Sequence, residues 1–384
     1  MRFAHISDTH LGYRQYNFDE RESDFYEVFN EAINTILKER VDVIIHSGDL
    51  FDSSAPSIKA LKVFKDCIEK INGKAKFISI LGDHDTPKRR GLYPHSLFDN
   101  VKVLGIGELE YIDVNGVLIA GISNLRGRGI DILRSELKKF DHIAKNYSKS
   151  ILILHQAIDR YLPFEGAYEL REDEIPRSAS YYAFGHLHFR VVNRFGKGFL
   201  AYAGSTEIAN KGEISSWISD GKGFYIVDLD GDEPIIHRFN LEVRPQIDLE
   251  LNIMNDSEMI KALKILDDGL RGLFKFSSKP PIVHLTIRCR DVDRQRIMNN
   301  VNKHIKGRVL GLRVNFISES TPTSISSIKG GVDYKVLLRE YLKSCGLSGE
   351  EYLNLALELQ ELLVNDEIEE AKKFVEKFFG VEVK

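Results

Sequence analysis

Residues 3–10, FAHISDTH, set the pattern for the first half of the chain: a short apolar run leads directly into two potential metal ligands, Asp8 and His10. Short runs of β-branched or aromatic residues bounded by polar residues are typical of buried parallel strands. Residues two apart on an extended backbone project to the same side, so Asp8 and His10 should face one site. This stretch therefore predicts a buried strand that ends at a functional site.

Four further apolar runs, at residues 41–46, 77–81, 151–154 and 181–184, are each followed closely by an aspartate or a histidine. Parallel strands in α/β proteins build their sites at their carboxyl ends, so these side chains are expected to meet. Carboxylates and imidazoles gathered there are what a hydrolytic site with two divalent cations requires. The predicted ligands are Asp8, His10, Asp49, Asp83, His155, His186 and His188.

Each of these residues has a simpler explanation when it is taken alone. A single histidine at a strand end is more often a hydrogen-bonded core residue, and a single aspartate after glycine is usually part of a turn or a helix cap. The ordered spacings Asp-x-His, Gly-Asp, Gly-Asp-His-Asp, His and Gly-His-x-His are far harder to attribute to chance. Gly48, which precedes Asp49, is expected to let the backbone approach a bound ion closely.

The composition is that of a soluble globular protein. Hydrophobic residues make up 43% of the 384 residues, and this length suggests two or three domains. No apolar run approaches membrane-spanning length and no signal peptide is evident, so we expect a cytoplasmic protein that has no membrane partner. The three cysteines are far apart and form no CxxC pair, which argues against a zinc site or a disulfide framework.

The charge is unevenly distributed, although the net charge is only −4. Residues 288–313 contain eight Lys and Arg against two Asp, whereas residues 331–384 contain seven Lys and Arg against twelve Asp and Glu. A nearly neutral protein can still carry a local surface that attracts phosphate groups. A solvated basic surface on a small domain explains the same pattern equally well.

The alternation of strand-like runs and amphipathic helices predicts a layered α/β domain over residues 1–240. A second, compact α+β unit is expected over residues 241–317. Residues 318–331 are rich in Ser, Thr, Pro and Gly and predict a flexible linker. Residues 332–384 have helical apolar spacing but too little apolar surface to form a core alone, so these helices should dock on a partner or on the chain itself.

The ordered motifs resemble those of the calcineurin-like metallophosphoesterase superfamily, over roughly residues 1–230. Residues 5–13, 47–51, 154–156 and 182–188 are similar, more closely, to the double-strand-break repair nucleases of the meiotic-recombination-eleven and SbcD family. The resemblance implies an α/β fold, namely a layered αββα sandwich with a small α+β capping domain and a C-terminal helical tail.

The resemblance also implies two Mn²⁺ ions per subunit. Asp8, His10 and His188 would hold one ion, Asp83, His155 and His186 would hold the other, and Asp49 would bridge them. Mixed carboxylate and imidazole ligands without cysteine suit Mn²⁺ or Fe²⁺ better than structural zinc or magnesium. His84 would lie beside the scissile phosphate, with Asp85 orienting its ring.

Two positions depart from the pattern of the family. Asp83 stands where the family usually has asparagine, which adds a negative charge beside a phosphate-binding site. That charge is expected to tighten metal binding and to weaken anion binding. Asp52 stands where some relatives have histidine, so a phosphate-steering role for this position is not expected here.

The function implied by the resemblance is that of a nuclease for DNA double-strand breaks, associated with the nucleoid. It would degrade duplex ends as a 3′-to-5′ exonuclease and cut single strands or hairpins as an endonuclease. An SMC-like ABC-type ATPase would bind the tail helices, and a homodimer would form near Leu61 and Leu97, although core packing explains these two leucines equally well. DNA contacts are predicted for Tyr13, Arg14, Lys88, Arg89, Arg90, Arg126 and Arg128. The simpler alternative is that these residues lie in exposed loops without a role in binding.

Two other functions remain open at this point. The same metal site could serve a phosphatase or a small-molecule phosphodiesterase, although such enzymes rarely need a basic appended domain and docking helices. A DNA-end-bridging scaffold with an impaired metal site is the other alternative. The complete ligand set and His84 argue against the scaffold, whereas Asp83 is the one feature that favours it.

Overall fold

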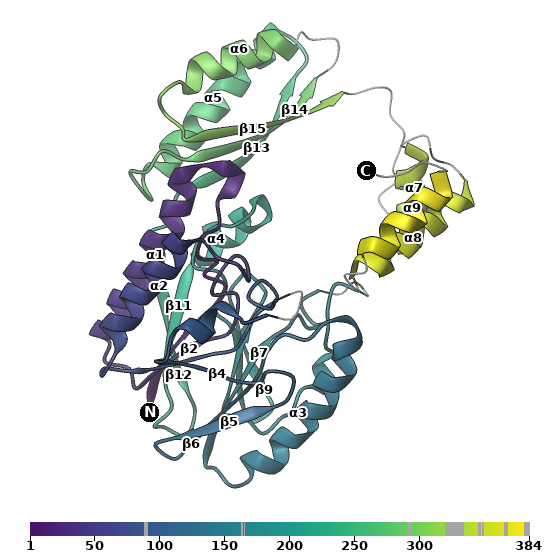
Figure 1. Cartoon of the computed structure of the whole chain (residues 1–384). Coiled ribbons are helices and arrows are strands. Elements are labelled where there is room, and N and C mark those ends of the chain that lie inside the picture. Colours follow the sequence, from purple (N-terminus) through teal and green to yellow (C-terminus); the bar gives the residue numbers. More distant parts are fainter. Residues whose placement is uncertain are drawn as a thin grey trace.

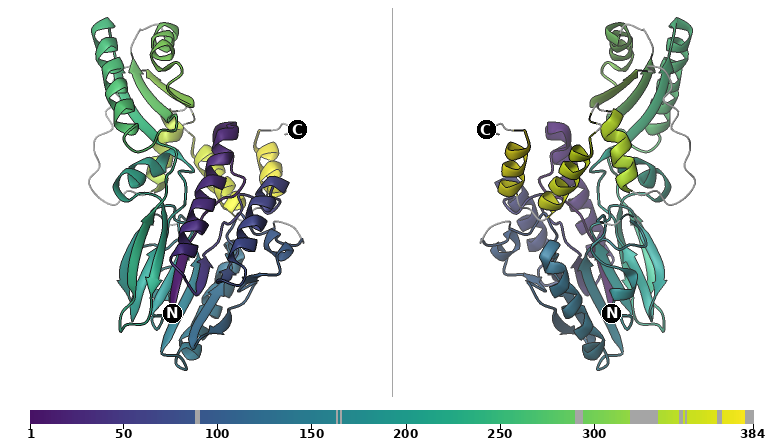
Figure 2. Two further views of the ribbon diagram at one scale, coloured as in Figure 1. Left: turned by 90° about the vertical axis from the view of Figure 1, so that its left-hand side faces the viewer. Right: turned by 90° about the vertical axis from the view of Figure 1, so that its right-hand side faces the viewer.

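Three β-sheets organise the chain. The computed structural model describes residues 1–87, 91–162, 164, 166–289, 294–318, 334–344, 347, 349–364 and 368–379 (Figure 1). Among these residues, two six-stranded sheets pack face to face, and a three-stranded sheet stands at the end of the molecule opposite the N-terminus (Figure 1 and Figure 2).

The first sheet contains, in order across it, β12 (Ile235–Asn240), β11 (Gly223–Asp228), β1 (Arg2–Ile6), β2 (Val43–His46), β3 (Lys76–Ser79) and β4 (Val101–Val103). Strands β1 to β4 run parallel, and β11 is antiparallel to β1. Because β1, β2 and β3 are parallel neighbours, the loops that follow them emerge at the same edge of the sheet.

The second sheet contains, in order, β5 (Glu110–Val114), β6 (Val117–Ile122), β7 (Lys149–His155), β8 (Tyr181–Gly185), β10 (Gly198–Tyr202) and β9 (Val191–Phe195). Strands β6, β7, β8 and β10 run parallel, and the two edge strands are antiparallel to their neighbours. The five strands predicted to lead into the site are therefore divided, three in the first sheet and two in the second.

Helices cover the outer face of each large sheet. Helices α1 (Asp19–Lys38) and α2 (Ile58–Ile71) pack on the first sheet, and α3 (Ile130–Ala144) packs on the second. The apolar residues of α1 lie at the spacing of a helical period, and Phe25, Phe29, Ile33 and Ile36 are all fully buried, as expected for an amphipathic helix that covers a sheet.

A separate core fills the space between the two sheets, to which Phe3 and Ile45 contribute from one side and Ile153 and Ala183 from the other. Nonpolar surface buried on both faces of each sheet stabilises this four-layer arrangement. The predicted αββα sandwich is confirmed.

The third sheet is formed by β13 (Gln246–Ile253), β14 (Ile282–Cys289) and β15 (Gly311–Ser318), which all run parallel. Helices α5 (Asp256–Leu273) and α6 (Arg294–Ile305) connect these strands and pack on the sheet through residues such as Leu266 and Ile297. Ser318, the first residue of the predicted linker, still belongs to β15, and the remaining residues of that predicted linker lie outside the described ones.

A buried polar network joins the sandwich to the third sheet. The carboxylate of Asp24 in α1 accepts hydrogen bonds from Arg21 at 2.7 Å, from Arg244 at 2.6 and 3.0 Å and from Lys279 at 3.1 Å. Buried charges of this kind are tolerated only when they are paired, so the network specifies how α1 meets the chain that leads into β13. The third sheet is thereby attached close to the loop that follows β1.

The C-terminal segment is helical, as predicted. Helices α7 (Tyr334–Ser344), α8 (Glu350–Val364) and α9 (Ile368–Phe379) lie well apart from the third sheet in Figure 1. The rings of Tyr352 and Phe378 are in edge contact at 5.8 Å, which joins α8 to α9. Within the described part of the chain, no helix combines the length and the apolar character needed to cross a membrane.

Candidate metal centre

The seven predicted ligands come together at one edge of the sandwich. Loops after β1, β2 and β3 supply Asp8, His10, Asp49 and Asp83 from the first sheet, and the ends of β7 and β8 supply the histidines from the second. They form overlapping groups of three, and in each group one nitrogen or oxygen atom from every side chain lies within 4.8 Å of those of the other two. The potential ligands are therefore close together because the edges of the two sheets that carry them lie next to each other.

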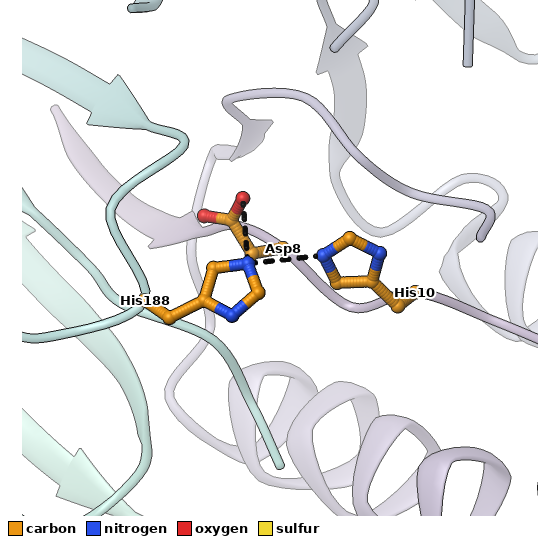
Figure 3. A group of neighbouring side chains, drawn as sticks. All are labelled: Asp8, His10 and His188. Atoms are coloured by element: carbon orange, nitrogen blue, oxygen red, sulfur yellow. Dashed lines mark hydrogen bonds and ion pairs between the residues drawn. The ribbon is translucent and has the colours of Figure 1, made fainter. Parts of the chain in front are cut away.

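The first group consists of Asp8, His10 and His188 (Figure 3). The Nε2 atoms of the two histidines lie 3.2 Å apart, and Nε2 of His188 lies 3.8 Å from Oδ1 of Asp8. The other ring nitrogen of His188, Nδ1, contacts Oε1 of Glu213 at 2.8 Å. Because this carboxylate can only accept, Nδ1 carries the proton, and Nε2 is left to bind a cation.

The second group consists of Asp83, His155 and His186. Oδ1 of Asp83 lies 3.2 Å from Nε2 of His155 and 3.2 Å from Nδ1 of His186. Nδ1 of His155 donates to the carbonyl oxygen of Ser47 at 2.8 Å, so Nε2 is the ring nitrogen that faces the centre and that would bind a cation after losing its proton.

Asp49 lies between the two groups. Its Oδ2 atom is 3.8 Å from Nε2 of His10 and 3.3 Å from Nε2 of His155. This is the position that a bridging ligand requires. The donor set, three carboxylates and four imidazoles without a thiolate, fits divalent transition-metal ions.

The backbone is strained at this edge. Asp8, His10, Asp49 and His186 have positive φ angles of 50°, 41°, 54° and 88°. Such conformations cost on the order of 1–3 kcal/mol each, and they persist where the surrounding structure imposes them, often at functional sites. These conformations occur at four of the seven residues whose side chains gather at this edge.

Gly48 lies against the ring of a predicted ligand. Its φ is +95°, and a Cβ atom on it would lie 2.4 Å from Nδ1 of His155. The missing side chain thus makes room for the imidazole ring of a ligand. A Cβ on Gly82 would similarly collide with Oδ1 of Asp49, at 2.0 Å.

The electrostatics of the cluster favour charged groups. Burial alone would lower the pKa of His10, but Asp52, Asp49 and Asp8 raise it to about 9. Burial also tends to lower the pKa of His155, but the carboxylates of Asp49 and Asp83 have a larger, opposite effect. The pKa of His155 therefore lies well above its usual value. Burial would raise the pKa of Asp49, but His155 keeps it below the usual range. Without a cation, these two histidines hold protons that a bound metal ion would have to displace.

His84 lies on the open side of the centre, with 43% of its side chain exposed. Its backbone N–H donates to Oδ1 of Asp49 at 2.9 Å, and its ring Nδ1 donates to the carbonyl oxygen of Asp52 at 2.8 Å. The Nε2 atom lies 3.8 Å from Oδ2 of Asp83. The ring is therefore held by one nitrogen and turns the other toward the second ligand group.

Asp85 does not orient this ring, contrary to the prediction. Its fully buried carboxylate accepts hydrogen bonds from the backbone N–H groups of Leu50, Phe51 and Gly82, at 2.9–3.1 Å. It therefore ties together the two loops that carry Asp49 and Asp83. The Asp52 carbonyl holds the ring instead, a contact that sequence spacing could not reveal because it depends on how two loops meet.

Several residues that surround the ligands were missed from the sequence. Asp52 lies 3.5 Å from Nδ1 of His10, Glu213 contacts His188, and Glu169 lies 3.9 Å from Nε2 of His186. Glu213 also pairs with the buried ammonium group of Lys222. The only sequence signal at Glu213 is the Asn-x-x-Glu pattern of a capping box before α4 (Ile214–Asp220), which indicates a helix start and no site.

The residues predicted to contact DNA lie in different surroundings. Nη2 of Arg126 lies 3.0 Å from Oδ2 of Asp83, directly at the centre, and Arg128 is exposed on the same loop. Tyr13 is half-buried against Phe25, and the exposed Arg14 pairs with Asp19 at 2.6 Å. The remaining three predicted contacts, Lys88, Arg89 and Arg90, lie outside the described residues.

Leu61 and Leu97, the two residues predicted at a dimer interface, differ in how far they are buried. Leu61 is half-buried and packs against the core of the first sheet, whereas the side chain of Leu97 is exposed. Core packing therefore accounts for Leu61 and does not account for Leu97.

Comparisons with known proteins agree with the geometry. Residues 1–190 match the family model described as calcineurin-like phosphoesterase. A DNA double-strand break repair protein Mre11 from Thermoplasma acidophilum is 39% identical over 78% of this chain and 80% of its own length. The Mre11 proteins of Saccharolobus solfataricus and Methanocaldococcus jannaschii are 33% and 34% identical, over 99% and 96% of both chains. The chain therefore belongs to the Mre11 family of calcineurin-like phosphoesterases.

Proposed function

We propose that this chain is a Mn²⁺-dependent DNA nuclease that processes double-strand breaks by hydrolysing phosphodiester bonds with two cations. The observation that carries the proposal is the meeting of seven oxygen and nitrogen ligands in two groups with Asp49 between them. The printed names of the related proteins support DNA breaks as the substrate. The activities would be 3′-to-5′ exonuclease action on duplex ends and endonuclease action on single strands.

The ligand roles follow the two groups. Asp8, His10 and His188 would hold one cation, Asp83, His155 and His186 would hold the other, and Asp49 would be shared. When bound, two such cations neutralise charge on the attacking and leaving oxygens of a phosphodiester. Imidazole and carboxylate ligands without thiolates support manganese as the preferred ion.

His84 would contact the scissile phosphate. Because Nδ1 donates to the Asp52 carbonyl, Nε2 carries a proton only when the ring is an imidazolium. In that form Nε2 can donate a hydrogen bond to the phosphate and transfer its proton to the leaving oxygen. Asp85 would act indirectly, by holding the loops that carry Asp49 and Asp83.

The third sheet would serve as a capping domain for DNA, spanning residues 241–317. Its support is the excess of Lys and Arg over residues 288–313 and its attachment close to the loop after β1. Tyr13, Arg14, Arg126 and Arg128 would contact the DNA backbone closer to the metal centre. Binding through such contacts should weaken steeply with added salt, because phosphate contacts release bound counterions.

Two kinds of protein partner are part of the proposal. An SMC-like ABC-type ATPase would bind helices α7 to α9, whose small size leaves them in need of a partner surface. A homodimer would form near Leu61 and Leu97. Leu97 is exposed, as are Leu92 and Ile58, by 81% and 85%. Contiguous exposed apolar surface marks a protein interface, so these side chains would support a dimer if they form one patch. The protein would work in the cytoplasm, at the nucleoid.

One assay separates this proposal from its alternatives. With Mn²⁺, the purified protein should digest 3′-labelled duplex DNA and circular single strands, and His84→Ala should abolish digestion while calorimetry still detects bound Mn²⁺. Rapid hydrolysis of a small phosphodiester with inert DNA would instead identify a small-molecule phosphodiesterase. Tight DNA binding without turnover of either substrate would identify a scaffold.

A further inference from the structure

The carboxylate of Asp83 divides its two oxygens between different surroundings. Oδ1 faces the imidazoles of His155 and His186, at 3.2 Å each. Oδ2 faces the open side, where it lies 3.0 Å from Nη2 of Arg126 and 3.8 Å from Nε2 of His84. One oxygen is thus placed to bind a cation, and the other pairs with a guanidinium.

The loop that carries Arg126 is attached to the ligand-bearing segments. The amide of Asn124 donates to the carbonyl oxygen of His155 at 2.6 Å, and its backbone N–H donates to Leu81 at 2.8 Å, two residues before Asp83. Gln156 donates to the carbonyl oxygen of Leu125 at 3.3 Å. These bonds set the position of the backbone from which Arg126 extends.

Arg126 itself is 44% exposed, so its guanidinium reaches the carboxylate and also the solvent on the open side. His84 is exposed to a similar extent on the same side of Asp83. An anion that approaches the second ligand group therefore meets the imidazole of His84 and the guanidinium of Arg126. A planar guanidinium is well suited to bind phosphate oxygens.

An asparagine at position 83 could not hold the guanidinium in this way. An asparagine whose oxygen faced His155 and His186 would present an amide NH₂ group to Arg126, and two donors cannot pair. The negative charge that Asp83 adds next to an anion site is also offset by Arg126. Residue 83 and residue 126 are therefore matched in charge and in hydrogen-bonding character.

We propose that Asp83 positions Arg126 so that its guanidinium binds a phosphate oxygen at the metal centre, and that Arg126 in turn offsets the charge of Asp83. This inference rests on the proposed hydrolysis of phosphodiesters at the same centre. It assigns Asp83 two tasks, that of a ligand through Oδ1 and that of an anchor for Arg126 through Oδ2.

A double-mutant cycle tests the pair, with Arg126→Gln, Asp83→Asn and the double variant. The readout is calorimetric binding of orthophosphate to protein saturated with Mn²⁺. In the unmodified protein, Arg126→Gln should weaken orthophosphate binding on the order of 10- to 100-fold, the range of a charge-assisted hydrogen bond. In the Asp83→Asn variant the same substitution should change it by about twofold or less, because the guanidinium has lost its nearest anchor and keeps only the more distant Glu169, whose Oε1 lies 3.8 Å from Nε of Arg126.

Arg134→Gln is the matched control, because Arg134 is a partly exposed arginine of α3 that pairs with Asp131 and Glu174 away from the centre. It should leave orthophosphate affinity unchanged. Equal losses on Arg126→Gln with and without Asp83 would overturn the proposal, as would no loss in either. A parallel loss of Mn²⁺ affinity on Arg126→Gln would overturn it too, since the arginine would then support the ligand rather than the anion.

Orthophosphate keeps this test independent of the substrate. If the pair is coupled but the protein digests no DNA, the nuclease proposal fails and the inference about Asp83 and Arg126 stands. If DNA is digested and the two substitutions act independently, the nuclease proposal stands and the inference fails.

Discussion

The two ligand groups of the metal centre differ in what lies behind them. His188 in the first group is backed by Glu213, which pairs with Lys222, and the side chain of Lys222 is only 1% exposed. Asp83 in the second group is backed by Arg126, which is 44% exposed. One group is supported by a buried ion pair and the other by a cation at the surface.

This difference indicates different roles for the two groups, with the first holding its cation in a fixed geometry and the second meeting the substrate. The ammonium of Lys222 donates to Glu213, to Ser205 at 2.7 Å and to the backbone carbonyl of His188 at 2.7 Å, so it holds both the ring partner and the main chain of a ligand. Such enclosure favours a fixed ligand geometry. The second group, open toward His84 and Arg126, is better placed to meet a substrate.

Removal of Asp49, the ligand that the two groups would share, should have the largest effect on Mn²⁺ binding. Asp49→Ala deletes the carboxylate that lies between His10 and His155, so Mn²⁺ binding should weaken at both groups and digestion of DNA should stop. Calorimetry with Mn²⁺ measures the stoichiometry and the affinity. Retention of two ions at unchanged affinity would show that Asp49 is not shared.

The next largest effect should come from Lys222→Met, which leaves the buried carboxylate of Glu213 without its ammonium partner. We expect a loss of unfolding free energy of about 3–5 kcal/mol, measured by chemical denaturation. Affinity for one ion should fall roughly 10- to 100-fold while the other is unaffected. The double variant Lys222→Met/Glu213→Gln should regain stability, because no buried charge remains. An equal loss at both ions would contradict the separate support of the two groups.

Metal affinity should also depend on pH. His10, with a pKa of about 9, and His155, whose pKa is also raised, are protonated at neutral pH without a cation. A cation must displace these protons, so apparent Mn²⁺ affinity should rise as the pH increases from 6 to 8. Calorimetry in buffers with different heats of ionisation counts the protons released.

A substitution of Asp52 should show which part of the pH dependence of Mn²⁺ affinity arises in the first group. Asp52→Asn removes a carboxylate that raises the pKa of His10. The pH dependence of the first group should therefore shift to lower pH, and that of the second should persist. Affinity that did not change with pH in the unmodified protein would refute the protonated state of both histidines.

The smallest effect is expected from Glu169→Gln. Glu169 lies 3.9 Å from Nε2 of His186 and also accepts the backbone N–H of Ala157, which glutamine can still do. Loss of a residue that hydrogen-bonds a metal ligand usually lowers metal affinity by roughly 10- to 100-fold. For Glu169→Gln, the affinity of the second group for Mn²⁺ should fall by less than about 10-fold. A loss as large as that of Lys222→Met would erase the contrast between the groups.

Much of the candidate site was predictable because its signals are local. The strand-like runs before Asp8, Asp49 and Asp83 and the spacing of His186 and His188 lie within short windows of sequence. The apolar face of α1 follows the helical period in the same way. Residue identity and periodicity decide which side chains can serve as ligands and which segments form strands and helices.

Other features depend on how distant segments meet. Glu213 lies 25 positions after His188, and Lys222 a further nine, with no shared motif. Arg126 was predicted to contact DNA, but its pairing with Asp83 was not foreseen. The ring partner of His84 was wrongly assigned to its neighbour Asp85, because adjacency in sequence says little about the direction of a side chain in a turn.

The ligand types, their order and the elements that carry them follow from residue identity and from apolar periods of two and 3.6 residues. The division of the strands, three in one sheet and two in the other, depends on long-range packing. So does the meeting of the ends of both sheets. Burial of the apolar faces between the sheets brings those ends together, and it acts on residues more than 100 positions apart, as between Ser47 and His155.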